Sequence, residues 1–203
     1  SVGGEQELLA VMDNARCLQD RSIRGQHYGW RYNYNARRVT EDAWLGPLPN
    51  WMAQEVGAVG GAGLFDVPPD QIIVNEYEPG QGIAAHVDCV PCFGPIIASL
   101  SLGGRVEMRF ENTATGEKRE TLLPPRSLLV LTGPARYEWR HTIPARKSDV
   151  IDGIRVGRKR RISPAFRMVI SDLTYFLTPS RAFVAVQLAI VYDVPPHVGF
   201  FCP

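Results

Sequence analysis

Short runs of alternating apolar and polar residues follow one another at near-regular spacing from Gln71 to Ile170. Alternation with a period of two is typical of strands that bury one face, and Arg105–Glu111 shows it most clearly. Eight such strands, with no long helix after residue 60, predict a mainly β fold: a double-sheet jelly roll with helices packed outside. The expected strands are Gln71–Tyr77, Ile83–Asp88, Ile96–Leu102, Arg105–Glu111, Lys118–Leu123, Ser127–Leu131, Arg136–Ile143 and Arg161–Ile170.

The first sixty residues have a different pattern. Glu5–Arg16 carries an apolar stripe with helical spacing, and Asn50 is placed to cap a second helix that extends to about Val59. Between them, Ile23–Tyr34 alternates with aromatic residues and indicates a strand or hairpin. Its aromatic face fits a core surface better than a base-stacking surface, but both interpretations stay open.

The protein of 203 residues is long enough for one domain with a sizeable core. We expect three parts: N-terminal helices and the aromatic strand (1–64), the jelly-roll core (65–172) and a C-terminal extension of open role (173–203). The net charge of +1 gives no global sign of a nucleic-acid binder. Four scattered cysteines indicate a reducing, intracellular compartment, cytoplasmic or nuclear, and no apolar run is long enough to suggest a membrane partner. The sequence opens at Ser, which leaves room for a preceding N-terminal segment.

A histidine and an aspartate stand two residues apart at the end of one predicted strand. In a strand, His86 and Asp88 share a face. Together they supply two parts of a 2-His-1-carboxylate triad, which leaves coordination positions on a ferrous ion open for a co-substrate and for oxygen. The third ligand must be His27, His141 or His197; His141 is favoured because it lies on a late strand that precedes an arginine-bearing strand.

The last predicted strand places two arginines and a hydroxyl on one face. Arg161, Ser163 and Arg167 follow the period of two. Inward-facing arginines are costly unless they meet a carboxylate, and a dicarboxylate such as 2-oxoglutarate meets this need. Asn75 and Tyr77 share a face of another strand and are placed to bind the same ligand. Taken singly, each of these residues also fits a solvated strand face or an internal ion pair.

These residues together resemble the AlkB family of iron(II)/2-oxoglutarate dioxygenases. The family pattern Asn-x-Tyr-x-x-Gly, His-x-Asp, His and Arg-x5-Arg is met from Asn75 to Arg167, and the resemblance runs from about Gly25 to Asp172. It is strongest to the branch whose AlkB domain hydroxylates a modified wobble uridine in tRNA. The resemblance implies a double-stranded β-helix and an enzyme that couples oxidative decarboxylation of 2-oxoglutarate, with O2, to hydroxylation of a C–H bond.

The resemblance also assigns roles to residues. His86, Asp88 and His141 are the catalytic metal ligands that it implies, and the cofactor residues are Asn75, Tyr77, Arg161, Ser163 and Arg167. It implies hydroxylation or demethylation of a modified or alkylated base in nucleic acid, with RNA slightly favoured over DNA. Two alternatives remain: a protein hydroxylase or demethylase on the same fold, and a binding module with a vestigial metal site.

Aromatic and basic residues form the expected nucleic-acid contact. The corresponding region of AlkB relatives forms a nucleotide-recognition lid, and a basic run near Arg161 would extend the same surface. Cys89-Val-Pro-Cys92 follows the expected metal ligands directly; with no second cysteine pair nearby, we interpret it as a loop with two thiols. The candidate contacts are Tyr32, Tyr34, Arg37, Arg38, Arg158 and Lys159.

Overall fold

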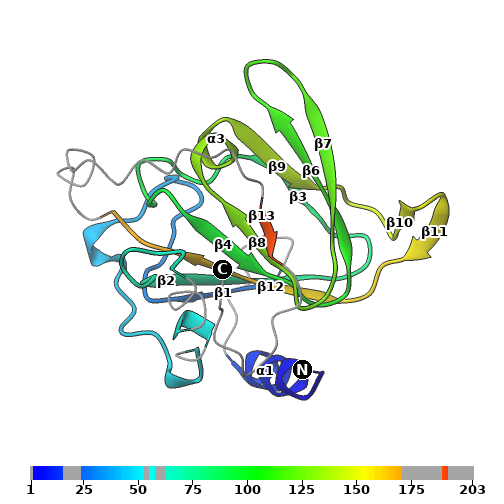
Figure 1. Ribbon diagram of the computed structural model, residues 1–203. Coiled ribbons are helices and arrows are strands. Elements are labelled where there is room, and N and C mark those ends of the chain that lie inside the picture. Colours follow the sequence, from blue (N-terminus) through cyan, green and yellow to red (C-terminus); the bar gives the residue numbers. More distant parts are fainter. Residues whose placement is uncertain (1, 16–23, 53–54, 58–62, 171–188, 192–203) are drawn as a thin grey trace.

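Two antiparallel sheets face each other and enclose the core of the molecule (Figure 1). The structure, a computed structural model, describes residues 2–15, 24–52, 55–57, 63–170 and 189–191. The larger sheet contains, in order, β1 (Arg24–Tyr28), β2 (Gln71–Tyr77), β12 (Arg161–Arg167), β4 (Ile97–Leu100), β8 (Leu128–Leu131) and β13 (Ala189–Val191), and β5 (Leu102–Gly103) also pairs with β12. The smaller sheet contains β3 (Ile83–His86), β9 (Trp139–Ile143), β6 (Val106–Asn112) and β7 (Lys118–Leu123).

The remaining elements are short. A separate hairpin, β10 (Ser148–Ile151) and β11 (Ile154–Gly157), projects beyond the sheets at the right of Figure 1. The helices are α1 (Val2–Asn14), α3 (Gly133–Tyr137) and two 3-10 turns, η1 (Glu41–Ala43) and η2 (Asn50–Met52). Among the described residues, no helix has the length and apolarity needed to span a membrane. The predicted mainly β jelly roll with an N-terminal helix outside is confirmed.

Strands β2 and β12 are buried on both faces, and the two faces have opposite character. Even-numbered residues such as Ile72 and Phe166 pack in the outer apolar cluster, which includes Leu8 and Met12 of α1. Odd-numbered residues such as Asn75 and Arg167 line a cavity between the sheets. Period-two geometry thus lets one strand anchor the helix and furnish the cavity at once.

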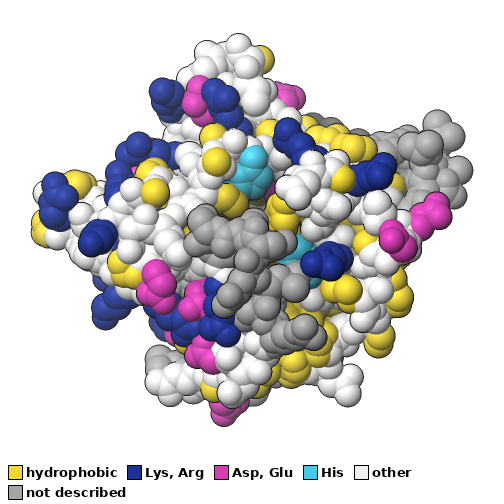
Figure 2. All heavy atoms as spheres, turned by 180° about the vertical axis from the view of Figure 1, so that it is seen from behind, with side chains coloured by type: hydrophobic (Ala, Val, Ile, Leu, Met, Phe, Trp, Pro, Cys, Tyr) yellow, Lys and Arg dark blue, Asp and Glu magenta, His cyan; other side chains and the backbone are white. Residues whose placement is uncertain are grey.

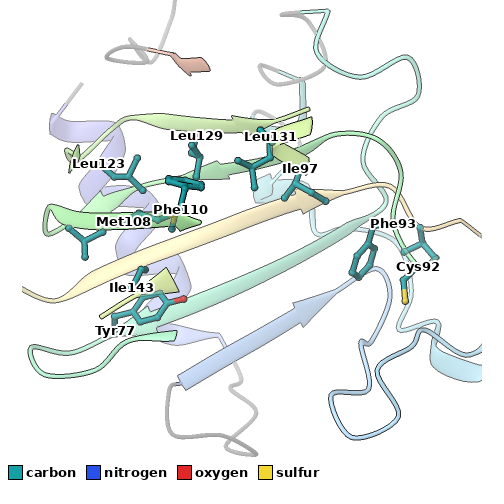
Figure 3. Close-up of a cluster of buried hydrophobic side chains, with 13 residues drawn as sticks. Tyr77, Cys92, Phe93, Ile97, Met108, Phe110, Leu123, Leu129, Leu131 and Ile143 are labelled. Carbon is teal, nitrogen blue, oxygen red and sulfur yellow. The ribbon is translucent and has the colours of Figure 1, made fainter. Parts of the chain in front are cut away.

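The core between the sheets is apolar and contacts this cavity. Strand β6 alternates as expected, with Val106, Met108 and Phe110 buried. Figure 3 shows the cluster to which these side chains belong, in which Met108 and Phe110 face residues of the larger sheet, including Leu129 and Leu131. Burial of such side chains stabilises the fold by roughly 1.5–3 kcal/mol each, and it fixes the separation of the sheets.

Three local predictions were wrong. The segment expected as a strand from Arg136 begins instead as helix α3, because Pro134 starts a helical turn and Arg136 is directed into the interior. The aromatic segment leaves the sheet after Tyr28 and continues as a loop. A strand that contains a proline such as Pro164 is expected at an edge or bulge, yet β12 lies inside the sheet. Its pairing with β4 and β5 is interrupted at residues 163 and 164, so the missing amide donor of Pro164 is tolerated there.

The hairpin β10–β11 was not predicted: it forms a two-stranded sheet of its own, and its apolar residues Val150 and Ile154 are exposed instead of lining a core. Its signal was the pair Asp152-Gly153, whose φ angles of 51° and 78° form a tight hairpin turn. Helix Asn50–Val59 is described only as η2 and residues 55–57, and most of the extension 173–203 lies outside the described residues. Within that extension, β13 adds a strand beside β8.

A buried carboxylate joins the hairpin to the smaller sheet. Asp149 is 2% exposed and accepts hydrogen bonds from Arg158 at 2.7 and 2.8 Å and from Arg146 at 2.8 Å. Arg146 also binds Glu107 of β6, at 2.6 Å. Burial alone would raise the pKa of Asp149, but the hydrogen bonds from Arg158 and Arg146 hold it below the ordinary 3.8.

We expect Asp149→Asn to lower the free energy of unfolding by about 2–4 kcal/mol, because a buried guanidinium loses its carboxylate. Urea denaturation at pH 7 measures this. A carboxyl with a depressed folded-state pKa stabilises the fold above its unfolded pKa and loses that effect as the pH falls through the folded value. The difference should therefore persist at pH 5. Asp152→Asn, in the exposed turn, is the matched control and should change stability by under about 0.5 kcal/mol; equal losses in both variants would contradict this role.

Candidate functional site

Antiparallel pairing of β3 and β9 brings two histidines together. His86 lies directly opposite His141 in the register, and their ring centroids are 4.4 Å apart. Asp88 follows two residues after His86, just beyond the end of β3, and its Oδ2 lies 4.0 Å from Nε2 of His141. The potential ligand atoms of the three residues all lie within 4.8 Å of one another. This is the convergence that a single bound cation requires.

The other candidate histidines do not join this cluster. His27 is buried in β1, where its Nδ1 accepts a hydrogen bond from the Tyr32 amide at 3.2 Å and its Nε2 lies 3.2 Å from the Tyr34 hydroxyl. It therefore organises the loop after β1. His197 lies outside the described residues. Among the described histidines, His141 is the one placed to complete the triad.

The protonation states of the cluster suit metal binding. His86 Nδ1 is 2.8 Å from the Ala84 carbonyl oxygen, so its Nε2 is directed to the cluster. Burial lowers the pKa of His141 to about 4, so its imidazole is neutral at pH 7. Burial would raise the pKa of Asp88, but the Arg167 guanidinium, followed by the two imidazoles, holds it well below its usual range. Two imidazoles, of which that of His141 is neutral, and one carboxylate are the donor set of a non-haem iron site.

A buried arginine fixes the loop that follows Asp88. Arg136 of α3 is 1% exposed and donates to the carbonyl oxygens of Asp88 at 2.9 Å and Cys89 at 3.2 Å. It also donates at 3.3 Å to the carbonyl oxygens of Phe93 and Gly94. These four hydrogen bonds join the donors of the Arg136 guanidinium to carbonyl oxygens of the turn. They hold the backbone at Asp88 in place.

The cavity beside the triad carries buried positive charge. Arg161 and Arg167 project into it from β12, with Ser163 between them. Arg161 donates to Ser101 Oγ at 3.0 Å and lies 5.6 Å from the centre of the Tyr77 ring. Arg167 donates to Asp88 Oδ1 at 3.1 Å. The cavity is lined by Asn75, Tyr77, Ile83, His86, Asp88, Ile97, Ser99, Met108, Leu129, Leu131, His141, Ile143, Arg161, Ser163, Ala165 and Arg167.

Both guanidinium groups retain unused donors. In each of Arg161 and Arg167, Nε and Nη1 are buried and have no hydrogen-bond partner. Burial lowers the pKa of Arg161 to about 10, so it is still charged at pH 7. Unpaired buried charge is unfavourable unless a ligand supplies the counter-charge. The cavity therefore favours binding of a small anion, and we propose that 2-oxoglutarate places one carboxylate at Arg161 and its keto-acid end near Arg167.

The predicted nucleic-acid residues fall into two groups. Tyr32 and Tyr34 lie half-buried in the loop of residues 29–38, which we call the lid loop, and Arg37 and Arg38 are exposed on it. Arg158 was expected as an exposed phosphate contact, and this is wrong: its side chain is 5% exposed and bound to Asp149 and the Pro144 carbonyl. Lys159 is exposed.

Tyr32 links the lid loop to the site. Its ring centroid lies 5.6 Å from that of Phe93, and the Phe93 ring lies 5.1 Å from the Arg167 guanidinium carbon. Burial raises the pKa of the Tyr32 hydroxyl, while Arg37, which donates a hydrogen bond to it, opposes the shift. Asp88 and Arg167 also influence this pKa, and the contacts of Tyr32 with Phe93 and of Phe93 with Arg167 connect the ring to Asp88.

Sequence reasoning missed several residues of the site. Ser99 Oγ lies 2.8 Å from Ser163 Oγ inside the cavity, and Ser101 binds Arg161. The sequence pattern that could have found Ser99 and Ser101 is their position on one face of the otherwise apolar strand Ile96–Leu102. Arg136 carried no local signal, because its role depends on the loop that it reaches. The loop Cys89–Cys92, expected to carry two thiols, is closed by a disulfide.

Comparisons with known proteins agree with this geometry. A model of the 2OG-Fe(II) oxygenase superfamily matches residues 10–167. An uncharacterized protein of Acanthamoeba polyphaga mimivirus is 37% identical over 173 residues, which cover 83% of this chain and 80% of that protein. Among solved structures, that of OsALKBH1 has a TM-score of 0.54 at 19% identity and covers 73% of this chain and 78% of its own, which shows the fold.

Two further relatives carry functional names. The tRNA (carboxymethyluridine(34)-5-O)-methyltransferase alkbh8 of Xenopus tropicalis is 40% identical over 137 residues, 67% of this chain but 21% of that protein. The alkylated DNA repair protein ALKBH8 homolog of Arabidopsis thaliana is 34% identical over 192 residues, which cover 83% of this chain and 56% of that protein. The chain thus spans only part of these named relatives.

We expect His86→Ala to weaken binding of a divalent metal at least about 100-fold, since removing even an outer-shell partner of a ligand costs 10–100-fold. Calorimetric titration with Mn(II), which avoids oxidation of iron, measures the dissociation constant. His27→Gln is the matched control, because His27 lies in the same structure away from the cluster. Metal affinity that survives His86→Ala would contradict the assigned centre.

We expect Arg161→Met to weaken 2-oxoglutarate binding about 10- to 100-fold, because charge-assisted hydrogen bonds to a carboxylate are lost. The neighbouring Arg160→Met is the control: Arg160 binds Glu76 at 2.7 Å and Asp13, and it does not line the cavity. Titration of the two metal-loaded variants with 2-oxoglutarate measures the dissociation constant of each. Equal affinities for Arg161→Met and the wild type would rule out the proposed carboxylate contact.

Proposed function

Because the chain belongs to the 2OG-Fe(II) oxygenase superfamily, and within it to the AlkB family, we propose that its substrate is a modified or alkylated base in nucleic acid. The protein is an Fe(II)- and 2-oxoglutarate-dependent dioxygenase that uses O2. Hydroxylation of a C–H bond in a base or its substituent, and oxidative demethylation of an N-methyl group, are the two outcomes that such chemistry gives.

The residues of the protein would prepare this reaction by position and charge. His86, Asp88 and His141 would hold the iron, which together with 2-oxoglutarate and O2 supplies the oxidising power for C–H hydroxylation. Arg161 would bind the distal carboxylate through its unused donors, with Asn75 and Tyr77 beside it. Arg167 keeps Asp88 ionised and would orient the keto-acid end. The apolar remainder of the cavity excludes water from the reacting atoms.

The lid loop is the observation that carries the choice of substrate. It presents aromatic rings next to exposed cations: Tyr32 contacts Phe93, which packs on Arg167 beside Asp88, and Arg37 and Arg38 are exposed on the same loop. Aromatic faces stack on bases, and guanidinium groups bind phosphates. Figure 2 shows Lys and Arg side chains distributed around histidine side chains on one face of the molecule. A base extruded from its strand would be held between ring and metal while its phosphates met the arginines.

RNA is favoured over DNA by the resemblance to the AlkB-homologue branch that acts on tRNA wobble uridine. The frog relative is named for a carboxymethyluridine at position 34 of tRNA, and the Arabidopsis relative is named for repair of alkylated DNA. A nucleic-acid substrate would place the protein in the cytoplasm or nucleus. Which base it modifies depends on the lid loop and on Val90, where some AlkB relatives carry an acidic residue.

The activity test measures succinate and formaldehyde released with Fe(II), 2-oxoglutarate and a panel of substrates: methylated RNA and DNA oligonucleotides, tRNA and methylated peptides. Mass spectrometry of the digested nucleosides identifies a hydroxylated product that releases no formaldehyde. His86→Ala is the blank. We expect turnover above the uncoupled rate with nucleic acid only. Turnover with peptides instead would make the protein a protein hydroxylase or demethylase.

We expect the double charge reversal Arg37→Glu/Arg38→Glu to weaken oligonucleotide binding roughly 10- to 100-fold and to reduce its salt slope by about two. Uncoupled 2-oxoglutarate turnover should be unchanged. Arg155→Glu is the matched control, because β11 lies at the other end of the molecule from the lid loop (Figure 1). Fluorescence anisotropy at several salt concentrations measures both quantities. Equal effects of the two variants would remove the lid loop from the interface.

A further inference from the structure

The loop after the metal ligand Asp88 contains a pair of cysteines that no role assigned so far uses. Cys89 and Cys92 are joined by a disulfide, with their Cα atoms 5.2 Å apart. Cys89 is half-buried and Cys92 is 6% exposed. Cysteines three residues apart can open and close such a bond when the loop that carries them keeps its shape.

The loop keeps its shape independently of the sulfur–sulfur bond. The Cys92 amide donates to the Cys89 carbonyl oxygen at 3.2 Å, and so does the Phe93 amide. Arg136 donates to four carbonyl oxygens, those of Asp88, Cys89, Phe93 and Gly94. On the side of the loop these bonds involve backbone atoms only, so they are present whether the cysteines are thiols or a disulfide. The two sulfur atoms therefore stay within bonding reach of each other, and Asp88 stays in place.

Both sulfur atoms also contact the lid loop. Cys89 Sγ lies 3.4 Å and Cys92 Sγ lies 3.8 Å from the carbonyl oxygen of Arg37. A thiol donates a weak hydrogen bond at such distances, whereas a disulfide has no hydrogen to donate. Arg37 has a φ of 52°, an uncommon conformation for a residue with a side chain. Reduction would therefore supply two thiol donors at this uncommon position of the lid loop, donors that the disulfide form described here lacks.

We propose that Cys89 and Cys92 form a reversible oxidation site whose redox state controls the order of the lid loop. The oxidant is a peroxide. The more exposed Cys89 sulfur bonds to one peroxide oxygen, the O–O bond breaks and one water leaves. The Cys92 sulfur then displaces the hydroxyl from Cys89, a second water leaves and the S–S bond forms. Two thiols and one hydrogen peroxide give one disulfide and two waters; a dithiol reductant reverses the change with two electrons.

The first test asks whether the pair cycles. The 203-residue protein with Cys17→Ser/Cys202→Ser, in which the pair supplies the remaining cysteines, is exposed to hydrogen peroxide and then to a dithiol, and its thiols are trapped by alkylation and counted by mass spectrometry. We expect peroxide to remove both reactive thiols without intermolecular linkage, and the dithiol to restore both. Two alkylated cysteines after peroxide, or further oxidation in place of a disulfide, would overturn the proposal.

The second test asks whether the redox state reaches the lid loop. Hydrogen exchange is measured at the amides of Asn33, Ala36 and Arg38, which are hydrogen-bonded within the loop. We expect roughly three- to tenfold faster exchange in the oxidised than in the reduced protein, the change that loss of weak hydrogen bonds gives. Cys89→Ser/Cys92→Ser retains two donors that do not form a disulfide, so it should exchange like the reduced protein before and after peroxide.

The matched variant Cys89→Ala/Cys92→Ala has no donors and should exchange like the oxidised protein at all times. Identical lid exchange in the Ser and Ala variants would overturn the coupling to the lid loop. Neither measurement requires a substrate, so the proposal can fail while the nucleic-acid function stands, and the reverse also holds. Mn(II) affinity should be equal in all forms, because Arg136 fixes Asp88 in each of them.

Discussion

Buried positive charge in the cavity between the two sheets is the constraint on which the rest of the site depends. Arg161 and Arg167 are 2% and 7% exposed, and desolvating such groups costs several kcal/mol each unless opposite charge compensates. Arg167 is compensated by Asp88 at 3.1 Å. Among the described residues, no carboxylate forms an ion pair with Arg161, which instead contacts a serine hydroxyl and the face of Tyr77. The buried charge of Arg161 therefore favours binding of an anion in this cavity.

The same strands explain how much of the protein could be predicted from its sequence. Alternation along Gln71–Tyr77 and Arg161–Arg167 separates apolar residues from polar ones, so both the strands and the shared face of Arg161, Ser163 and Arg167 were predictable. The sequence indicated that His86 and His141 come together, but not that they lie directly opposite each other, because the strand register depends on the whole sheet. Arg136, the hairpin β10–β11 and the path of the lid loop were missed, since each is defined by distant partners and not by a local period.

The division between strands and loops has a functional consequence. Strands β2, β3, β9 and β12 carry the residues proposed to bind metal and co-substrate, and their positions are fixed by packing within the sheets. The lid loop lies outside the sheets and is held by local hydrogen bonds, by His27 and by aromatic contacts such as that of Tyr32 with Phe93. Rigid strands hold reacting groups in a precise geometry. Loops suit recognition of substrates, because their sequence can change without disturbing the metal site. The cysteine loop lies between the two, joined to Asp88 on one side and to Arg37 on the other.

Arg158 shows why the charge of a segment is a poor guide to its partner. It belongs to the densest basic run of the sequence, yet Asp149 and a backbone carbonyl occupy its donors, and it contributes to the stability of the hairpin. Arg160, two residues on, is also taken up by carboxylates, those of Glu76 and Asp13. A phosphate would have to displace these partners before it gained any contact. Arg37 and Arg38, in contrast, are exposed on the loop whose Tyr32 contacts Phe93 and, through it, Arg167 of the cavity. If the substrate is a nucleic acid, its strand is therefore expected to approach over the lid loop, where the exposed cations lie.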